Sequence, residues 1–240
     1  MSHDITYLHI KRAIEKNTEC FLCTLEDEIE RKYIDTYLSE LVMDAPSRDK
    51  IIESRGFCNN HFYKMLIAAS KPESFDFQGM ALIMKSITEK LIQDLHGQED
   101  YCMMIPNENT CPACVHLADF MEMYVKHIVK LLSSNHEGFS KLFTESKGLC
   151  VPHFVTLMRV AEENADVKIR DLIETMTKVE EKSLQRLDLG LAEYIKRQSY
   201  EFSNKDRENV EDMVLRGIEK IAGRRGVKLS ILGGSKTRNV

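Results

Sequence analysis

The sequence predicts an all-α fold, and three observations carry this prediction. The chain has 240 residues, of which 43% are hydrophobic and 30% are charged, as is typical of globular proteins. Five prolines, eleven glycines and no tryptophan leave few of the residues that build turn-rich β folds. Apolar residues recur at spacings of three and four, which is the period of an α-helix. At about 150 residues per domain, this length predicts one large or two small domains.

Composition also excludes several classes of protein. The longest uninterrupted apolar run extends from Met80 to Met84, far short of the ~18 residues that a membrane span needs. The N-terminal residues lack the apolar core of a secretion signal. We therefore expect a cytoplasmic protein that does not contact a membrane. Its net charge of −5 argues against general coating of nucleic acid.

Six of the seven cysteines belong to paired motifs. The motifs are C-x-x-C at Cys20 and Cys23, C-x-x-H at Cys58 and His61, a second C-x-x-C at Cys111 and Cys114, and a second C-x-x-H at Cys150 and His153. The second copies follow the first by 91 positions (20 to 111) and 92 positions (58 to 150). In a reducing compartment such spacing indicates metal ligands or redox thiols rather than disulfides.

The duplication extends beyond these motifs. Identical residues recur around the two C-x-x-H motifs: Ser54, Gly56, Phe62 and Ala69 match Ser146, Gly148, Phe154 and Ala161. Apolar positions of residues 29–41 answer to those of residues 120–132 at helical spacing. One structural unit is therefore used twice. We expect two tandem homologous helical units, residues 1–100 and 101–206, packed into one helical body and followed by a C-terminal helix and basic tail, residues 207–240.

Each expected helix has a local signal. A first helix is expected over residues 4–16. An amphipathic helix begins at each C-x-x-C motif, and Pro112 is suited to the first helical position of the second of these. Short helices over residues 48–55 and 137–147 end at Gly56 and Gly148, where a positive φ is needed. Further helices begin at Cys58 and Cys150. The remaining helices are expected over residues 74–96, 165–206 and 208–222, with a polar boundary at residues 97–110.

The leading interpretation of the motifs is a structural Zn²⁺ site in each half, made by three thiolates and one imidazole. A helix N-terminus favours thiolate over thiol, and ligands three positions apart share one helical face. Four protein ligands fill a tetrahedral coordination sphere, so the role is expected to be structural and not catalytic. Pairing of ligands within each repeat is the simpler arrangement, and pairing across the repeats stays open.

Two other readings use the same residues. An iron–sulfur cluster can be held by thiolates with one histidine. A redox dithiol would cycle each C-x-x-C to a disulfide, although the usual βαβ context is missing. Cys102 has no counterpart in the repeat and is interpreted as an incidental linker thiol. We identify no catalytic residues, and we interpret the remaining candidates as polar helix surface: His116, Asp119, Glu122, His9, His96, His127 and His136.

The C-terminal residues are basic. Residues 216–240 carry seven basic side chains and one acidic side chain. This asymmetry is compatible with a nucleic-acid contact, but we interpret it as a solvated helix end and tail. We expect a binding or scaffolding module with a protein partner, and the oligomeric state stays open. The alternatives are a redox or iron–sulfur protein, a nucleic-acid-associated regulator and a metal-dependent enzyme.

The segments ECFLC…SRGFCNNHF and TCPAC…SKGLCVPHF resemble a prokaryotic family of uncharacterised proteins with duplicated CPxC and GFCxxH elements. The resemblance covers most of the chain and selects the same eight ligands. This sequence departs from the family pattern at Phe21, where the family more often has proline, and at Leu149 in place of phenylalanine. Neither position is a ligand. The resemblance implies no known activity.

Overall fold

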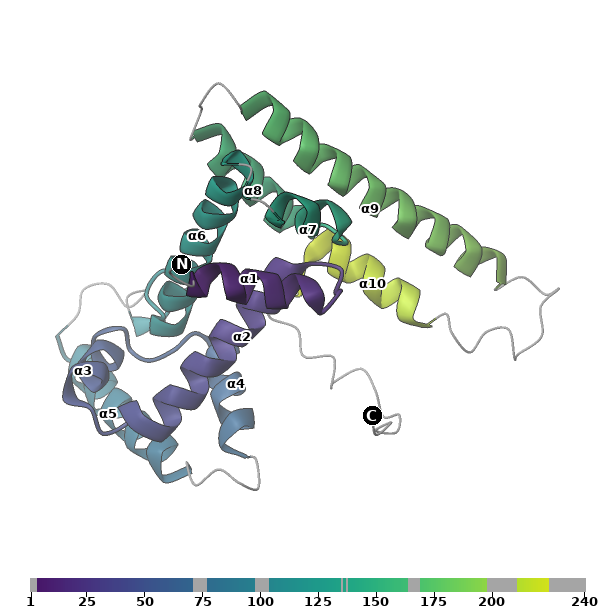
Figure 1. Ribbon diagram of the computed structural model, residues 1–240. Coiled ribbons are helices and arrows are strands. Elements are labelled where there is room, and N and C mark those ends of the chain that lie inside the picture. The colour runs from purple at the N-terminus through teal and green to yellow at the C-terminus, as the bar shows by residue number, and fades with distance from the viewer. Residues whose placement is uncertain are drawn as a thin grey trace. The chain divides into compact units, whose positions relative to one another are not determined.

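A computed structural model describes residues 4–70, 77–97, 104–134, 136, 138–163, 169–197 and 211–224. Within these ranges the regular elements are helices and no strand occurs, which confirms the all-α prediction (Figure 1). None of the helices in the described ranges has the length and apolar character needed to cross a membrane.

The helices follow one another in order along the chain. Their bounds are α1 Ile5–Glu15, α2 Phe21–Thr36, the π-helical turn η1 Tyr37–Leu41, α3 Ala45–Glu53, α4 Asn59–Ala69, α5 Phe77–Leu95, α6 Pro112–Ser133, α7 Phe139–Glu145, α8 Val151–Glu163, α9 Ile169–Arg197 and α10 Glu211–Ala222. Each predicted helix is present, with bounds shifted by a few residues. Parts of the predictions lie outside the described residues: 74–76, residues 98–103 of the boundary, 137, 165–168, 198–210 and the tail from 225.

The chain divides into two compact units. Unit 1 comprises Met1–Thr24 and Ile128–Val240, and unit 2 comprises Leu25–His127. The chain enters unit 2 within α2 and leaves it within α6. Each unit therefore takes residues from both halves of the sequence, and the units divide the chain at other positions than the repeat boundaries expected near residues 100 and 206.

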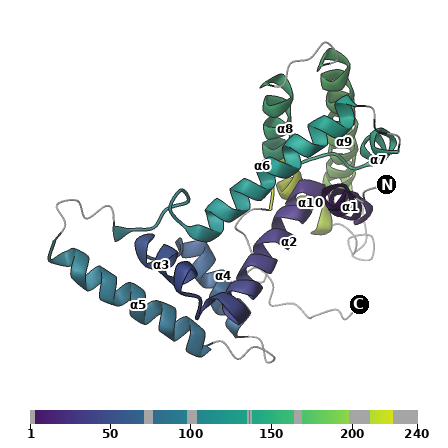
Figure 2. The same cartoon turned by 60° about the vertical axis from the view of Figure 1, so that its left-hand side comes forward.

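In unit 2, α5 packs against α3 and α4 (Figure 2). The core of this unit is built from large apolar side chains, among them Ile51, Met65 and Ile83. Phe57 is fully buried and makes edge contacts with the rings of Tyr37 and Phe62. Because Phe57 directly precedes Cys58, this packing fixes the start of α4.

In unit 1, the long helix α9 packs against α7, α8 and α10 (Figure 1). Helix α1 packs against α7. Phe139 is fully buried at the start of α7, with ring centroids 6.1 Å from Tyr7 and 6.4 Å from Phe143. Phe21, the first residue of α2, also contacts Phe143 edge-on. This aromatic cluster joins the N-terminal helices to the C-terminal part of the chain.

Both short helices end in the left-handed turn that the sequence predicts. Gly56 has φ +102° and Gly148 has φ +76°. A Cβ atom on Gly56 would lie 2.6 Å from Cζ of Phe62, so a side chain is excluded there by space as well as by conformation. Arg55, with φ +58°, shares the left-handed conformation, which the sequence did not indicate. The turns direct the chain into the C-x-x-H motifs.

Replacing Phe139 by alanine removes the centre of the aromatic cluster of unit 1. We expect Phe139→Ala to lower the free energy of unfolding of unit 1 by about 3–5 kcal/mol, because a buried ring is lost and a cavity remains. Urea denaturation followed by circular dichroism measures this change. Leu189→Ala is the control, since Leu189 is 71% exposed and its loss should change stability by less than about 0.5 kcal/mol. Equal losses in both variants would contradict the assigned core.

Candidate metal centres

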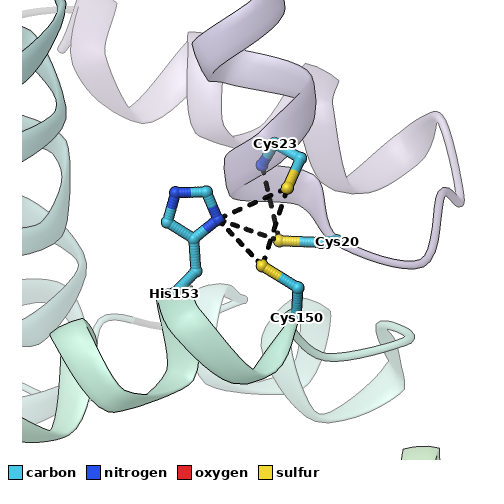
Figure 3. Close-up of side chains that lie close together, drawn as sticks. All are labelled: Cys20, Cys23, Cys150 and His153. Atoms are coloured by element: carbon cyan, nitrogen blue, oxygen red, sulfur yellow. Dashed lines mark hydrogen bonds between the residues drawn. The ribbon is translucent and has the colours of Figure 1, made fainter. Parts of the chain in front are cut away.

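The first candidate centre, the outer site, is formed by Cys20, Cys23, Cys150 and His153 (Figure 3). Nδ1 of His153 lies 3.4 Å from Sγ of Cys20, 3.4 Å from Sγ of Cys23 and 3.1 Å from Sγ of Cys150. The Sγ atoms of Cys23 and Cys150 are 3.6 Å apart. All three cysteines are buried. The four donor atoms therefore face one common point in unit 1.

The second candidate centre, the inner site, is formed by Cys58, His61, Cys111 and Cys114 in unit 2. Nδ1 of His61 lies 3.2 Å from Sγ of Cys58, 3.5 Å from Sγ of Cys111 and 3.3 Å from Sγ of Cys114. The Sγ atoms of Cys58 and Cys114 are 3.7 Å apart. The inner site therefore repeats the geometry of the outer site almost distance for distance.

Each ligand pair lies at the N-terminus of a helix, as predicted. Cys20 and Cys111 directly precede α2 and α6, and Cys58 and Cys150 directly precede α4 and α8. The second ligand of each pair lies in the first turn, three positions later and on the same face. At the outer site the backbone N–H of Cys23 donates to Sγ of Cys20 at 3.4 Å, so a free amide of the helix start stabilises negative charge on sulfur.

The pairing of the motifs differs from the simpler arrangement expected from the sequence. Each C-x-x-C joins the C-x-x-H of the other half: Cys20 and Cys23 meet Cys150 and His153, and the inner site pairs the remaining motifs. Pairing within each repeat is therefore wrong, and the arrangement that the sequence left open is the one observed. Each of the eight predicted ligands lies in one of the two groups.

Helix lengths explain this exchange. Helix α2 has 16 residues, which at 1.5 Å per residue carries the chain about 24 Å away from Cys20. The returning helix α3 has nine residues and recovers only about 14 Å before Cys58 is reached. In the second half the imbalance is larger, because α6 has 22 residues and α7 has seven. In each half, the C-x-x-H motif that follows next in the sequence is thus held away from the C-x-x-C motif of the same half.

Burial of the sulfurs makes the ion-free outer site unfavourable for charge. Desolvation raises the pKa of the Cys20 thiol to about 12. A thiol with so high a pKa stays protonated at neutral pH, and three neighbouring thiolates would repel one another. A divalent cation at the common point would reverse both effects, since it offsets most of the charge of the three thiolates and replaces their protons.

The inner site has a polar support for its histidine. Nε2 of His61 lies 3.0 Å from Oε1 of Glu30, and Nζ of Lys64 lies 2.6 Å from Oε2 of Glu30. Burial lowers the pKa of His61, but hydrogen bonds with Cys111 and Glu30 outweigh it and raise the pKa to about 10. Burial raises the pKa of Glu30, and its bonds to His61 and Lys64 lower it below the ordinary value. The carboxylate fixes the imidazole with Nδ1 toward the sulfurs.

Sequence reasoning missed this support, although a signal was present. Glu30 lies seven positions after Cys23, two helical turns along the same face, and Lys64 lies one turn after His61. Sequence reasoning also missed Glu19, which is buried beside the outer site and bonded to Arg186 and Arg216 at distances from 2.6 to 3.1 Å. Burial raises the pKa of Glu19, but the two guanidinium groups prevail and hold it at about 2.

The other sequence candidates do not join a centre. Within the described ranges, the outer and inner sites are the two groups of histidine, cysteine and acidic side chains that can hold a metal ion. The ring of His116 contacts the rings of Tyr33 and Phe120 at tilted angles, with each centroid 4.6 Å away. Glu122 pairs with Lys126 on the exposed surface. Cys102 lies outside the described residues.

The fold and the two centres define a class: an all-helical protein with two groups of three cysteines and one histidine, each able to hold a metal ion. The chain belongs to a family described as a family of unknown function (DUF6062), whose model matches residues 1–228. The resemblance expected from the duplicated motifs is thereby confirmed. No curated protein and no solved structure matched the chain.

Double variants test the exchange of ligand pairs. Cys20→Ser/Cys150→Ser changes the outer site alone, so it should retain one of the two bound ions. Cys20→Ser/Cys58→Ser changes both sites, so it should retain neither ion. Elemental analysis of the purified variants gives the count. The reverse result, with one ion kept only in the second variant, would restore pairing within each repeat.

Removing the charge of Glu30 tests the support of the inner site. We expect Glu30→Gln to weaken metal binding at the inner site by about 10–100-fold, because the imidazole loses the carboxylate that orients it. Competition with a chromophoric chelator measures the affinity of each site. Glu40→Gln, an exposed acid of the same unit, is the control and should leave both affinities unchanged. Equal inner-site affinities in the two variants would show that Glu30 has no such role.

Proposed function

We propose that the outer and inner sites each bind one Zn²⁺ as a structural centre, and that the protein is a helical scaffold for a protein partner. One observation carries this proposal: in each group of ligands, all four donor atoms lie within 4.8 Å of one another. This span suits a single ion at the common point.

The distances favour a single ion over a cluster. With Zn–S bonds of about 2.3 Å and Zn–N bonds of about 2.0–2.1 Å, a tetrahedron has S···S and S···N edges of roughly 3.5–3.8 Å. One pair of sulfurs is 3.6 Å apart at the outer site and one pair is 3.7 Å apart at the inner site, and the S···N distances run from 3.1 to 3.5 Å. The ligands of an iron–sulfur cluster bind different irons and must surround several metal atoms. The cluster alternative would require the donors to move apart.

The donor set favours zinc as the ion and a structural role. Three sulfurs and one imidazole nitrogen in tetrahedral array are typical ligands of structural zinc, whereas magnesium and calcium prefer oxygen. Four protein donors leave no coordination position for a water molecule, which catalytic zinc sites keep. We therefore place the protein among scaffolds and not among metal-dependent enzymes. A reducing compartment such as the cytoplasm would keep the thiols available for the metal.

The basic C-terminal residues support a structural use of charge more than a nucleic-acid contact. Arg216 bonds to Glu19, Lys220 pairs with Glu180 at 2.9 Å, and Arg224 donates to Thr24 at 3.0 Å. These three cations of the seven are thus engaged within unit 1. The outward side of α10 instead carries exposed apolar residues one turn apart, Val214, Ile218 and Ile221, which is typical of surfaces that meet another protein.

Metal removal tests the structural role. Structural zinc contributes about 10–16 kcal/mol in small zinc peptides, comparable to the ~5–15 kcal/mol that stabilises a whole domain. We expect anaerobically purified protein to be colourless with two zinc ions per chain, one for each site. An excess of chelator, which empties both sites, should then lower the helical circular dichroism, and added zinc should restore it.

The alternatives give different results in the same experiment. A brown protein containing iron and sulfide would contradict zinc and favour a cluster. A metal-free protein with full helical signal would contradict structural metal, and reversible C-x-x-C disulfides in it would favour the redox dithiol. Retention on DNA or RNA that falls steeply with salt would favour the nucleic-acid-associated regulator.

A further inference from the structure

Helix α10 presents one face to the outer site. Arg216 and Lys220 lie four positions apart and share a face of the helix, and Arg224 follows just after its C-terminal end. Nε of Arg216 donates to Glu19 at 2.8 Å, and a guanidinium N–H of Arg224 donates to Thr24 at 3.0 Å. Glu19 and Thr24 flank the first ligand pair. Arg216 of α10 and Arg224 just after it therefore hold the segment that supplies Cys20 and Cys23.

The same face of α10 also holds the segment that supplies Cys150. The ammonium group of Lys220 donates to the backbone carbonyl of Leu149 and, at 3.3 Å, to that of Lys147. Lys220 also pairs with Glu180 of α9, and Glu180 accepts from the backbone N–H of Leu149 at 3.1 Å. Helix α10 thus bridges both segments from which the outer site is assembled.

The contact of Lys220 with these segments depends on the position of the turn before Cys150. Its side chain is 0% exposed, and a buried ammonium group is strongly unfavourable unless it is paired and hydrogen-bonded. Its partners include two carbonyls of the turn before Cys150. Gly148 leaves room for them, because a Cβ there would lie 2.8 Å from Glu180 and 3.3 Å from Lys220. If this turn moves, Lys220 loses partners that its burial requires.

The end of α10 lies directly on the sulfurs. Gly223 has φ +79°, and a Cβ at this position would lie 3.3 Å from Sγ of Cys150 and 3.7 Å from Sγ of Cys23. The backbone N–H of the next residue, Arg224, donates to Cys23. Amide donors of this kind stabilise negative charge on sulfur. The left-handed turn at Gly223 therefore supplies part of the surroundings of the outer site.

We propose that α10 is a metal-dependent latch: residues 211–224 dock on the rest of unit 1 when the outer site holds its ion and detach from it when the ion is lost. This inference rests on metal binding at the outer site. An ion holds the segments of Cys20 and Cys150 at the separation that α10 bridges. The coupling is reciprocal, so docked α10 must also strengthen metal binding. The inner site, whose ligands lie in unit 2, should not affect the latch.

Hydrogen exchange of the full-length protein tests the first direction of the coupling. Amides of residues 211–224 should exchange at least about tenfold faster in Cys150→Ser than in the zinc-loaded wild type. Cys58→Ser, which empties the inner site, is the matched control and should leave their exchange unchanged. Helix α1 of unit 1 should keep its protection in Cys150→Ser. Unchanged α10 exchange would overturn the latch, and so would equal deprotection of α1 and α10, which would mean that unit 1 opens as a whole.

A pair of glycine variants tests the reverse direction. Gly223→Ala and Gly138→Ala both place a side chain in the left-handed region, at φ +79° and φ +85°, but only Gly223 lies near the sulfurs. A Cβ on Gly138 would meet no other atom within 4 Å. We expect Gly223→Ala to weaken the outer site about tenfold relative to Gly138→Ala, with the inner site as internal standard. Chelator competition measures both affinities, and equal outer-site affinities in the two variants would overturn the coupling.

The result also separates this inference from the function on which it rests. A wild-type protein that carries no metal would overturn both. Suppose that the wild-type protein carries two ions, but hydrogen exchange of residues 211–224 is the same in Cys150→Ser as in the wild type. This result would overturn the latch and would not contradict the structural zinc centres.

Discussion

The length of two rigid helices is the constraint on which the rest of the structure depends. Helices α2 and α6 each begin at a C-x-x-C motif and run for 16 and 22 residues, while the helices that return the chain, α3 and α7, have nine and seven. Each of these helices therefore carries the chain farther from its C-x-x-C motif than the following helix can bring it back, which favours pairing with the C-x-x-H motif of the other half. Exchange of ligand pairs between the halves satisfies both centres without bending a helix.

Because the ligand pairs are exchanged between the halves, the loop of chain closed by the inner site lies within the loop closed by the outer site. The inner site joins Cys58 to Cys114 across 56 positions, and the outer site joins Cys23 to Cys150 across 127 positions that contain the inner loop. Each doubling of loop length adds only about 0.6 kcal/mol to the entropy of closure, so the longer loop is a minor penalty beside metal binding. A closed inner site also shortens the free chain that the outer site must close. Nesting therefore makes assembly from the inner site outward the less costly order.

Most of the fold and the eight candidate ligands were predictable from the sequence, because they depend on local patterns. Apolar spacing placed the helices, and Gly56 and Gly148 marked their left-handed ends. The partner of each motif was not predictable in the same way, because it depends on distances summed over several helices. The helix lengths that decide it were within reach of the sequence. The contact of Lys220 with Glu180 was not, since it joins helices whose relative rotation no local pattern fixes.

The two centres use different supports for similar ligands. At the inner site the support lies in the same unit as the ligands, because Lys64 follows His61 by one turn of α4, and Glu30 of α2 contacts both His61 and Lys64. At the outer site the support comes from α9 and α10, far along the chain, through Glu180, Lys220 and the turn at Gly223. A support made within neighbouring helices forms together with its site. A support supplied by the last helix can be present or absent while the ligands stay in place, and this difference is what allows one centre to respond to α10 and the other not.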